Sequence, residues 1–342
     1  MPLPPLTAPP RLSFAFGPLG LDKLFSEADR HRLQNCCRIT SDEPLREFES
    51  EAARALLADT DILITGWGCP PIDATVLATA PSIRLIAHAA GSVKHLIGST
   101  VFERGIAVTN AAAANAIPVA DFALAAILFA SKDVFRFQRL YAQQRRPLEL
   151  HQFFDGDSGS WHKKVGIVGA SRIGRRVLDL LHPHDIDILL YDPLVNAAEA
   201  RLLGANLVSL SELMGECQTV SLHAPLLAAT RHMIDADMLA RMRDGATLIN
   251  TARGGLVDHA ALEAELSSGR LSAVLDVTEP EVLPADSPLY DLPNVVLTPH
   301  IAGAIGNERR LLGRLVADEI ERFVAGKPLQ HSLTLESLQH QA

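Results

Sequence analysis

The chain has 342 residues, 48% of them hydrophobic, and a formal net charge of −9 at pH 7. This length allows about two domains of ~150 residues, the apolar content excludes a mainly disordered chain, and the acidic balance argues against nucleic acid as a main partner. We expect no membrane partner, because no apolar run reaches the ~20 residues that span a bilayer.

The start of the chain and its cysteines predict a reduced, cytoplasmic protein. Residues 1–14 lack both the basic region and the apolar core of a secretory signal. The four cysteines, two of them adjacent at Cys36 and Cys37, match neither a disulfide framework nor a C-x-x-C zinc pair. No cluster of histidine and acidic residues has metal-ligand spacing, so we expect no metal site.

Short β-rich runs alternate with helix-like stretches early in the chain. The runs at 61–67, 83–90 and 105–110 are separated by stretches such as PIDATVLATA, which predicts parallel strands joined by crossover helices. A long helix is predicted from Pro118, placed in its first turn, to about residue 141. The polar, turn-rich segment 142–161 is predicted to be an arm or connection rather than core.

A second alternating series begins at residue 165. The predicted strands are VGIVG, IDILLYD, TVSLHAP, ATLINTA, AVLDV and VVLTPH, and helices are expected around 198–203, 211–215, 235–243 and 258–268. Gly269 is placed to end the last of these helices. A long amphipathic helix is predicted around 307–326. Both series together indicate an α/β protein.

The turn after the first strand of this second series carries a nucleotide-binding signature. It reads G-A-S-R-I-G, where G-x-G-x-x-G would be the full fingerprint. Gly169 supplies the tight turn and Gly174 the close packing of helix on sheet, while Ser171 stands where the backbone meets pyrophosphate. Asp192 closes the next strand, 192 − 169 = 23 residues later, where a carboxylate binds the adenosine ribose and repels a 2′-phosphate. We therefore predict that the protein binds NAD rather than NADP. The alternative interpretation of the same residues is an ordinary βα turn followed by an Asp-Pro turn.

Three side chains of complementary chemistry follow later strands. Arg253 lies beyond ATLIN, where ligands of open α/β sheets bind, and its guanidinium can hold a carboxylate with two hydrogen bonds. His300 is a candidate proton donor, and a neighbouring carboxylate would stabilise its charged form and fix its tautomer. Spacing alone does not choose between Glu279 and Glu281 as that partner. The set suggests an anionic carbonyl substrate, a proton from imidazole and a hydride carried by a nicotinamide.

As a set, these motifs resemble the D-isomer-specific 2-hydroxyacid dehydrogenases. The resemblance rests on VGIVGASRIGRRV, YDP, SLHAPL, LINTARGGLVD, LDVTEPEVLPADSPLYDLPNVVLTPHIAG and, more weakly, VTNAAAANAIPVAD, which together span about 105–305. The family pattern D-V-x-x-x-E, starting at Asp276, selects Glu281 over Glu279. The resemblance implies Arg253, Glu281 and His300 as the catalytic residues.

The resemblance also implies NAD as the cofactor. Its implied contacts are Gly169, Ser171, Arg172, Ile173 and Gly174 in the pyrophosphate loop, Asp192 at the ribose, Ala224, Pro225, Thr251, Ala252 and Asp276 on the nicotinamide side, and Gly303. The family's substrate-carboxylate loop, G-x-G-x-D-N-I-D, maps onto residues 88–95, which lack one glycine and the acidic tail. The backbone N–H groups of Gly91, Ser92 and Val93 are the candidate anion holders there.

The implied architecture is two Rossmann-like, doubly wound parallel-sheet domains. A flavodoxin-like substrate domain comprises 1–112 and 306–342, and an NAD-binding Rossmann domain comprises 113–305, with the active site in the cleft between them. The helix after Pro118 and the arm at 142–161 would form a homodimer interface. Asp121 and Thr278 replace the family's usual glutamate and aromatic residue, and we expect small effects from both.

The predicted function is interconversion of a small 2-keto acid and its D-2-hydroxy acid by an NAD-dependent oxidoreductase. Trp67 and Leu96 are candidates to shape the pocket for the substrate side chain. One alternative is an NAD(H)-sensing binding protein like the corepressors that share this fold, which keep the same three catalytic residues. Another is a dehydrogenase for phosphite or formate; Glu281 argues against formate, because formate enzymes of this kind pair the histidine with an amide.

Overall fold

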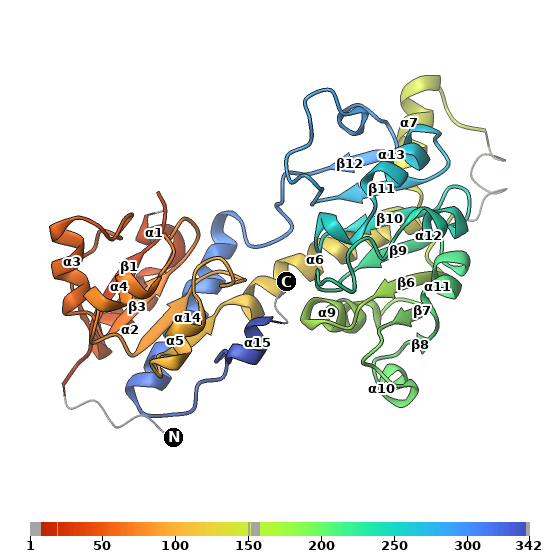
Figure 1. The fold of residues 1–342 in the computed structure, drawn as a ribbon. Coiled ribbons are helices and arrows are strands. Elements are labelled where there is room, and N and C mark those ends of the chain that lie inside the picture. Colours follow the sequence, from red (N-terminus) through yellow and green to blue (C-terminus); the bar gives the residue numbers. More distant parts are fainter. Residues whose placement is uncertain (1–7, 19, 150, 152–157, 340–342) are drawn as a thin grey trace. The chain divides into compact units, whose positions relative to one another are not determined.

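The computed structural model describes residues 8–18, 20–149, 151 and 158–339, and the chain forms two compact units (Figure 1). The first unit comprises Met1–Asn115 and Ala304–Gln341, and the second comprises Ala116–Gly303. The boundaries between the two units fall after residues 115 and 303, whereas the sequence predicted them after residues 112 and 305. The first unit is therefore built from both ends of the chain.

The first unit is a five-stranded parallel sheet in the order β2-β1-β3-β4-β5. Its strands are β1 (Arg11–Ala15), β2 (Arg38–Ile39), β3 (Ile62–Thr65), β4 (Leu85–His88) and β5 (Ala107–Asn110). Its helices are α1 (Leu21–Leu24), α2 (Glu27–Cys36), α3 (Glu51–Ala58), α4 (Ala74–Thr79), α5 (Ser99–Glu103), α14 (Arg309–Val324) and α15 (Leu335–Gln339). Strands β3 and β4 are buried along their whole length, as expected for a parallel sheet covered on both faces. The strand order is that of flavodoxin-like folds and confirms the prediction.

The second unit is a seven-stranded parallel sheet in the order β12-β11-β10-β9-β6-β7-β8. Its strands are β6 (Lys163–Val168), β7 (Ile186–Tyr191), β8 (Asn206–Leu207), β9 (Thr219–Leu222), β10 (Thr247–Asn250), β11 (Ser272–Leu275) and β12 (Val295–Leu297). Its later helices are α9 (Arg172–Leu181), α10 (Ala197–Leu202), α11 (Leu210–Glu216), α12 (Ala236–Arg241) and α13 (His259–Ser267). The chain runs outward from β6 to β8 and returns to β9 on the other side of β6. This reversal is the topological switch point at which open α/β sheets of the Rossmann type bind ligands, and it confirms the predicted fold class.

The long helix predicted from Pro118 to about residue 141 is two helices in the structure. Helix α6 (Ala112–Ser131) begins before Pro118, which lies in its interior, so the placement of this proline in a first turn was wrong. Alanine has the highest helix propensity, and the alanine-rich run ahead of Pro118 starts the helix earlier. Asp133, in the left-handed conformation at φ 58°, separates α6 from α7 (Val134–Gln144). Of the arm predicted at 142–161, residues 150 and 152–157 lie outside the described residues.

By length and composition alone, α6 is apolar enough to cross a membrane, which contradicts our expectation that no segment reaches that length. Its mean hydropathy is 1.8, and 44% of the apolar window is buried within the protein. Ala123 and Ile127 of α6 are buried in the same apolar cluster as Val165 and Ile167 of β6. Core helices of water-soluble proteins meet the same criterion, so it is weak support for a membrane span.

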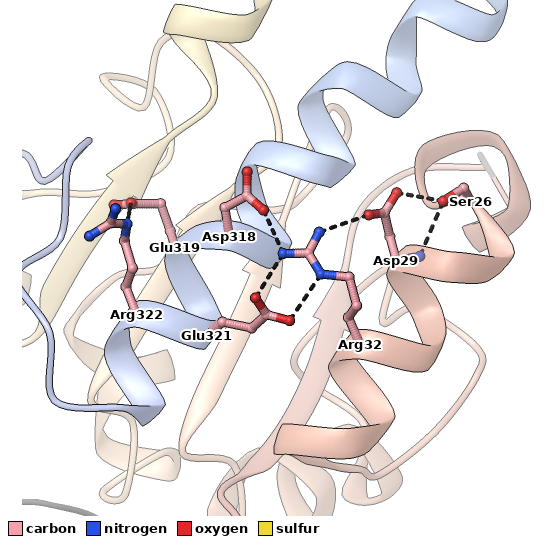
Figure 2. A network of polar contacts seen from close by, with 7 residues as sticks. All are labelled: Ser26, Asp29, Arg32, Asp318, Glu319, Glu321 and Arg322. Carbon is pink, nitrogen blue, oxygen red and sulfur yellow. Dashed lines mark hydrogen bonds and ion pairs between the residues drawn. The ribbon is translucent and has the colours of Figure 1, made fainter.

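A polar network joins helix α14 to α2 near the start of the chain (Figure 2). Arg32 of α2 donates to both carboxylate oxygens of Glu321, at 2.9 and 2.8 Å, and to Asp318 at 2.5 Å. The same guanidinium donates to Asp29 at 3.1 Å. The hydrogen bond from Arg32 lowers the pKa of Glu321. Because these side chains are partly exposed, each pair contributes about 0.2–1 kcal/mol, less than burial of one large apolar side chain at about 1.5–3 kcal/mol.

Gly313 tests how closely α14 packs on α1. A Cβ at this position would lie 2.0 Å from the carbonyl oxygen of Leu24, and backbone cannot rotate away. Gly313→Ala gains up to about 1 kcal/mol of helix propensity, but we expect overpacking to prevail with a net loss of roughly 1–3 kcal/mol in urea unfolding. In Gly215→Ala of α11 the nearest atom would be 3.9 Å away, so that control should be neutral or stabilised. Equal stability of the two variants would contradict the close packing of α14.

Candidate active site

A carboxylate, an imidazole and a guanidinium lie together in the second unit, each following a different strand. His300 Nδ1 is 2.5 Å from Glu281 Oε1, and both side chains are about half exposed, at 50% and 58%. Arg253 is half-buried; burial lowers the pKa of its guanidinium, and the nearby charge of Glu281 opposes that effect. The structure therefore pairs Glu281 with His300 and places Arg253 within the influence of the Glu281 charge, while the catalytic roles of the three residues stay predictions.

Glu279, the competing carboxylate, points to other partners. Its carboxylate accepts from Arg231 at 2.7 Å and lies 3.3 Å from His232 Nε2. The hydrogen bond from Arg231 is the main cause that lowers the pKa of Glu279. Spacing left the choice open, and the structure pairs Glu281 with His300. Within the described part of the chain, no group of three or more histidine, cysteine or acidic side chains could hold a metal ion.

Asp276, directly after β11, holds the segment that carries His300. Its side chain is only 1% exposed. One carboxylate oxygen accepts from Thr298 Oγ1 at 2.6 Å and from the Ile301 N–H at 2.8 Å, and the other accepts from the Ala302 N–H at 2.8 Å. His300 has a φ of 55°, a left-handed conformation that is uncommon for a residue with a side chain. The hydrogen bonds on both sides of His300 fix this conformation, and the predicted cofactor contact of Asp276 stays a prediction.

The turn after β10 presents Arg253. The fully buried Asn250 accepts from the Ala252 N–H at 3.0 Å and donates to the Arg253 carbonyl at 2.9 Å. Arg253 Nη1 donates to the Ala252 carbonyl at 2.6 Å. A Cβ at Gly254 would lie 2.1 Å from the carbonyl of Thr278, so only glycine allows this turn to pack on the segment leading to Glu281. Asn250 was not singled out in the sequence, although a polar residue that ends an apolar strand was a usable signal.

The predicted nucleotide turn has the geometry that the fingerprint requires. Gly169 has a φ of 100°, and a Cβ there would lie 2.6 Å from the Ala224 nitrogen. A Cβ at Gly174 would lie 2.0 Å from the Gly169 carbonyl oxygen, so the helix can meet the turn only with glycine here. Ser171 caps α9 by accepting from the Gly174 N–H at 3.3 Å, which leaves its own hydrogen as a donor.

Asp192 is tied to this turn. One carboxylate oxygen accepts from the Ala170 N–H at 2.7 Å and the other from the Leu194 N–H at 2.8 Å. Each carboxylate oxygen has a second lone pair, so Asp192 can also accept from a ribose hydroxyl. His223, after β9, is buried beside Ser221, and burial lowers the pKa of its imidazole to about 4. This histidine is therefore a neutral support behind the turn.

The remaining predicted cofactor contacts lie after the carboxyl ends of the same strands. Arg172 is exposed in the first turn of α9, Ile173, Pro225, Ala252 and Gly303 are half-buried, and Ala224 and Thr251 are buried. Thr251 Oγ1 is buried and has no hydrogen-bond partner among the described residues. A buried hydroxyl without a partner is a group that a polar ligand atom would satisfy. Together with the glycine turn, it shows that these residues fit a dinucleotide.

The predicted substrate loop belongs to the first unit. Gly91 accepts from Asn110 Nδ2 at 2.7 Å, and a Cβ at Gly91 would meet open space. The side chain of Val93 is buried in the core, as is that of Leu96, which removes Leu96 as a wall of an open pocket. His88 is buried and lies 2.9 Å from Thr65 Oγ1, and burial lowers the pKa of His88 to about 3. Ser92 is half-buried, and a joint action of this loop with Arg253 stays a prediction.

Comparison with known proteins places these features in one family. The family model of the D-isomer specific 2-hydroxyacid dehydrogenase, NAD binding domain, matches residues 124–302. A glyoxylate reductase of Korarchaeum cryptofilum is 36% identical over 258 residues, which are 75% of this chain and 78% of that protein. A D-3-phosphoglycerate dehydrogenase of Archaeoglobus fulgidus is 30% identical over 78% of this chain, but this chain spans only 50% of its length. The solved structure of Rhodotorula graminis D-mandelate dehydrogenase has a TM-score of 0.78 and 26% identity, and the match covers 96% of this chain and 98% of that one.

Proposed function

Because this chain belongs to the D-isomer specific 2-hydroxyacid dehydrogenases, we propose that it interconverts a small 2-keto acid and its D-2-hydroxy acid. The observation that carries this proposal is the 2.5 Å contact between His300 and Glu281 beside Arg253. An imidazole paired with a carboxylate can donate and accept a proton, and a neighbouring guanidinium can hold the anionic end of the substrate.

Each of the three side chains has a separate role in reduction. Arg253 binds the substrate carboxylate and polarises the carbonyl group. His300 has its Nδ1 turned to Glu281, so the ring's other nitrogen, Nε2, carries the proton to the carbonyl oxygen as the new O–H bond forms. Glu281 stabilises the protonated ring and fixes which nitrogen faces the substrate. NAD supplies hydride transfer when it is bound, and oxidation reverses each step.

Turnover separates this proposal from the alternatives of a corepressor-like NAD(H) sensor and a dehydrogenase for another small anion. NADH oxidation measured with 2-keto acids of graded size, from glyoxylate upward, should reveal a substrate. Phosphite and formate with NAD⁺ belong in the same panel. Tight NADH binding without turnover of any of these compounds would favour the sensing protein.

The first test of the mechanism is removal of the proton donor. His300→Ala should lower kcat by roughly 10²–10⁴, the usual contribution of general acid–base catalysis, while NADH binding changes little. Reduction needs the protonated ring, so Glu281→Gln, which removes the stabilising charge, should move the alkaline limb of the pH profile to lower pH. His31→Ala, on an exposed position of α2, is the control and should match wild type. Near-normal turnover by His300→Ala would exclude the mechanism.

We propose that NADH is preferred over NADPH, because the carboxylate of Asp192 would face a 2′-phosphate. The expected result is a higher kcat/KM with NADH, measured for both cofactors with one keto acid, and a smaller difference in Asp192→Ala. Asp187→Ala removes a half-exposed carboxylate from β7, the strand that Asp192 follows, and should leave the preference unchanged. An equal or better value with NADPH in wild type would overturn this assignment.

We propose that the chain forms a homodimer through α6 and α7. No residue of α7 is buried, Tyr141 is 61% exposed, and Phe129 of α6 is 53% exposed, so these helices present large apolar side chains to solvent. Light scattering should give about twice the 36.9 kDa chain mass at micromolar concentration. Phe129→Asp should dissociate the dimer, whereas Leu202→Asp, at an 85% exposed site on α10, should not. A wild-type monomer would contradict this proposal.

A further inference from the structure

Thr278 carries an interaction that its place in the sequence did not suggest. It lies three residues beyond the end of β11, is 6% exposed, and occupies the position where the family usually has an aromatic residue. Its hydroxyl donates to the Pro280 carbonyl at 2.8 Å, and the Glu281 carbonyl lies 3.1 Å from the same oxygen. The single hydroxyl hydrogen is thus shared between the two backbone carbonyls on either side of the Glu281 Cα.

We propose that Thr278 is a positioning residue for Glu281, and through it for the proton donor His300. The inference rests on the proposed function, since it assigns the role of a side chain behind the same pair. The hydroxyl fixes the backbone from which the Glu281 side chain extends. It thereby holds the carboxylate within hydrogen-bond distance of the imidazole.

The need for such an anchor follows from the exposure of the pair. Glu281 and His300 are about half exposed, so burial does not restrict their side chains. The residue next to Glu281, Val282, is 78% exposed and adds no packing there. A glutamate side chain has several rotatable bonds, and ordering it costs conformational entropy. Fixing its backbone reduces the freedom that the 2.5 Å contact must restrict.

Groups on both sides of Glu281 anchor this segment: after it, Leu283 is buried and its carbonyl accepts from Tyr290 Oη at 3.2 Å, and before it, Glu279 is held. The Glu279 N–H donates to His259 Nε2 at 3.2 Å, and the Glu279 carboxylate is held by Arg231 and His232. The turn at Gly254 packs against the Thr278 carbonyl. Beyond Glu279, the hydrogen bonds found in the described residues that fix the carbonyls of Pro280 and Glu281 come from Thr278.

The charged groups that face Glu281 are Arg253 and His300, and none of those around Glu279 replaces them. When the Glu281 contact is lost, the protonated ring of His300 loses its nearest opposite charge. The neutral ring also loses the acceptor that favours hydrogen on Nδ1. Weakening the anchor therefore alters both the protonation and the tautomer of His300, two properties that a purely structural residue would leave unchanged.

The matched pair Thr278→Val and Thr278→Ser separates the hydroxyl from the packing. Valine keeps the shape and removes the hydrogen bond, while serine keeps the hydroxyl. For Thr278→Val we expect kcat of keto-acid reduction to fall roughly 3–10-fold, as loss of one hydrogen bond allows. The alkaline limb of its pH profile should move to lower pH. KM should stay within about twofold because Arg253 is untouched, and Thr278→Ser should stay close to wild type.

A second readout does not depend on turnover. Nitrogen-15 NMR of the histidine rings, with the His300 signals assigned by their absence in His300→Ala, reports the tautomer of the neutral ring. Wild type and Thr278→Ser should show hydrogen mainly on Nδ1, and Thr278→Val should show more of the Nε2–H form. If wild type turned over no keto acid, the proposed function would fail while this measurement still tested the role of Thr278.

The outcomes against the inference are distinct. An unchanged tautomer and pH profile in Thr278→Val would overturn it, as would equal losses in the valine and serine variants. If the valine variant unfolds, Thr278→Ala removes the same hydroxyl without the added methyl group, and the same tautomer shift is expected. A folded Thr278→Ala with the wild-type tautomer would also refute the role of Thr278.

Discussion

The buried carboxylate of Asp276 is the constraint on which the candidate site depends. A buried carboxylate is costly unless hydrogen bonds compensate it, and the three groups that donate to the Asp276 carboxylate lie in the segment from Thr298 to Ala302. The hydrogen bonds that compensate the burial of this carboxylate also fix the backbone on either side of His300. The left-handed conformation of His300, unfavourable by itself, persists because these bonds define the residues around it. Asp276, at the end of β11, therefore determines where the His300 imidazole lies, although His300 itself follows the neighbouring strand β12.

Strand order explains why the three reactive side chains meet. Strands β10, β11 and β12 are consecutive neighbours in the parallel sheet, and Arg253, Glu281 and His300 follow them in that order. The carboxyl ends of parallel strands lie at the same edge of the sheet, so residues that follow these strands come close together although they are far apart in the chain. The glycine turn after β6 and Asp192 after β7 lie at the same edge, on the other side of the reversal in strand order. The predicted nucleotide turn and the Glu281–His300 pair therefore lie along one edge of the sheet.

The sequence predicted those features that depend on local pattern. Apolar runs such as ILIT predicted most strands of four or more residues, and the glycine spacing located the turn at Gly169. No strand was predicted at β1, which has five residues, or at β2 and β8, which have two residues each and no periodicity to detect. Pro118 misled the helix boundary because its local preference for a first turn was weaker than the helix propensity of the alanines before it. Glu279 and Glu281 are equivalent by spacing; the resemblance to the family pattern selected Glu281, and the tertiary contacts of Arg231 with Glu279 and of His300 with Glu281 agree with that choice. The hydrogen bonds of the Thr278 hydroxyl were not predicted, since its partners are backbone carbonyls that no side-chain pattern marks.

The exposure of the pair has a consequence for when its electrostatics matter. In water the attraction between Glu281 and His300 is strongly screened, and at short range it grows several-fold as the surroundings become less polar. A substrate that covers the imidazole and the guanidinium removes water from both. Removal of this water therefore strengthens the attraction of Glu281 for the protonated ring and the attraction of Arg253 for an anion. In this arrangement a weak, solvent-exposed contact is sufficient in the free protein, because the Asp276 carboxylate accepts from backbone N–H groups beside His300 and the Thr278 hydroxyl donates to the backbone of Glu281. The electrostatic stabilisation increases when the site is covered.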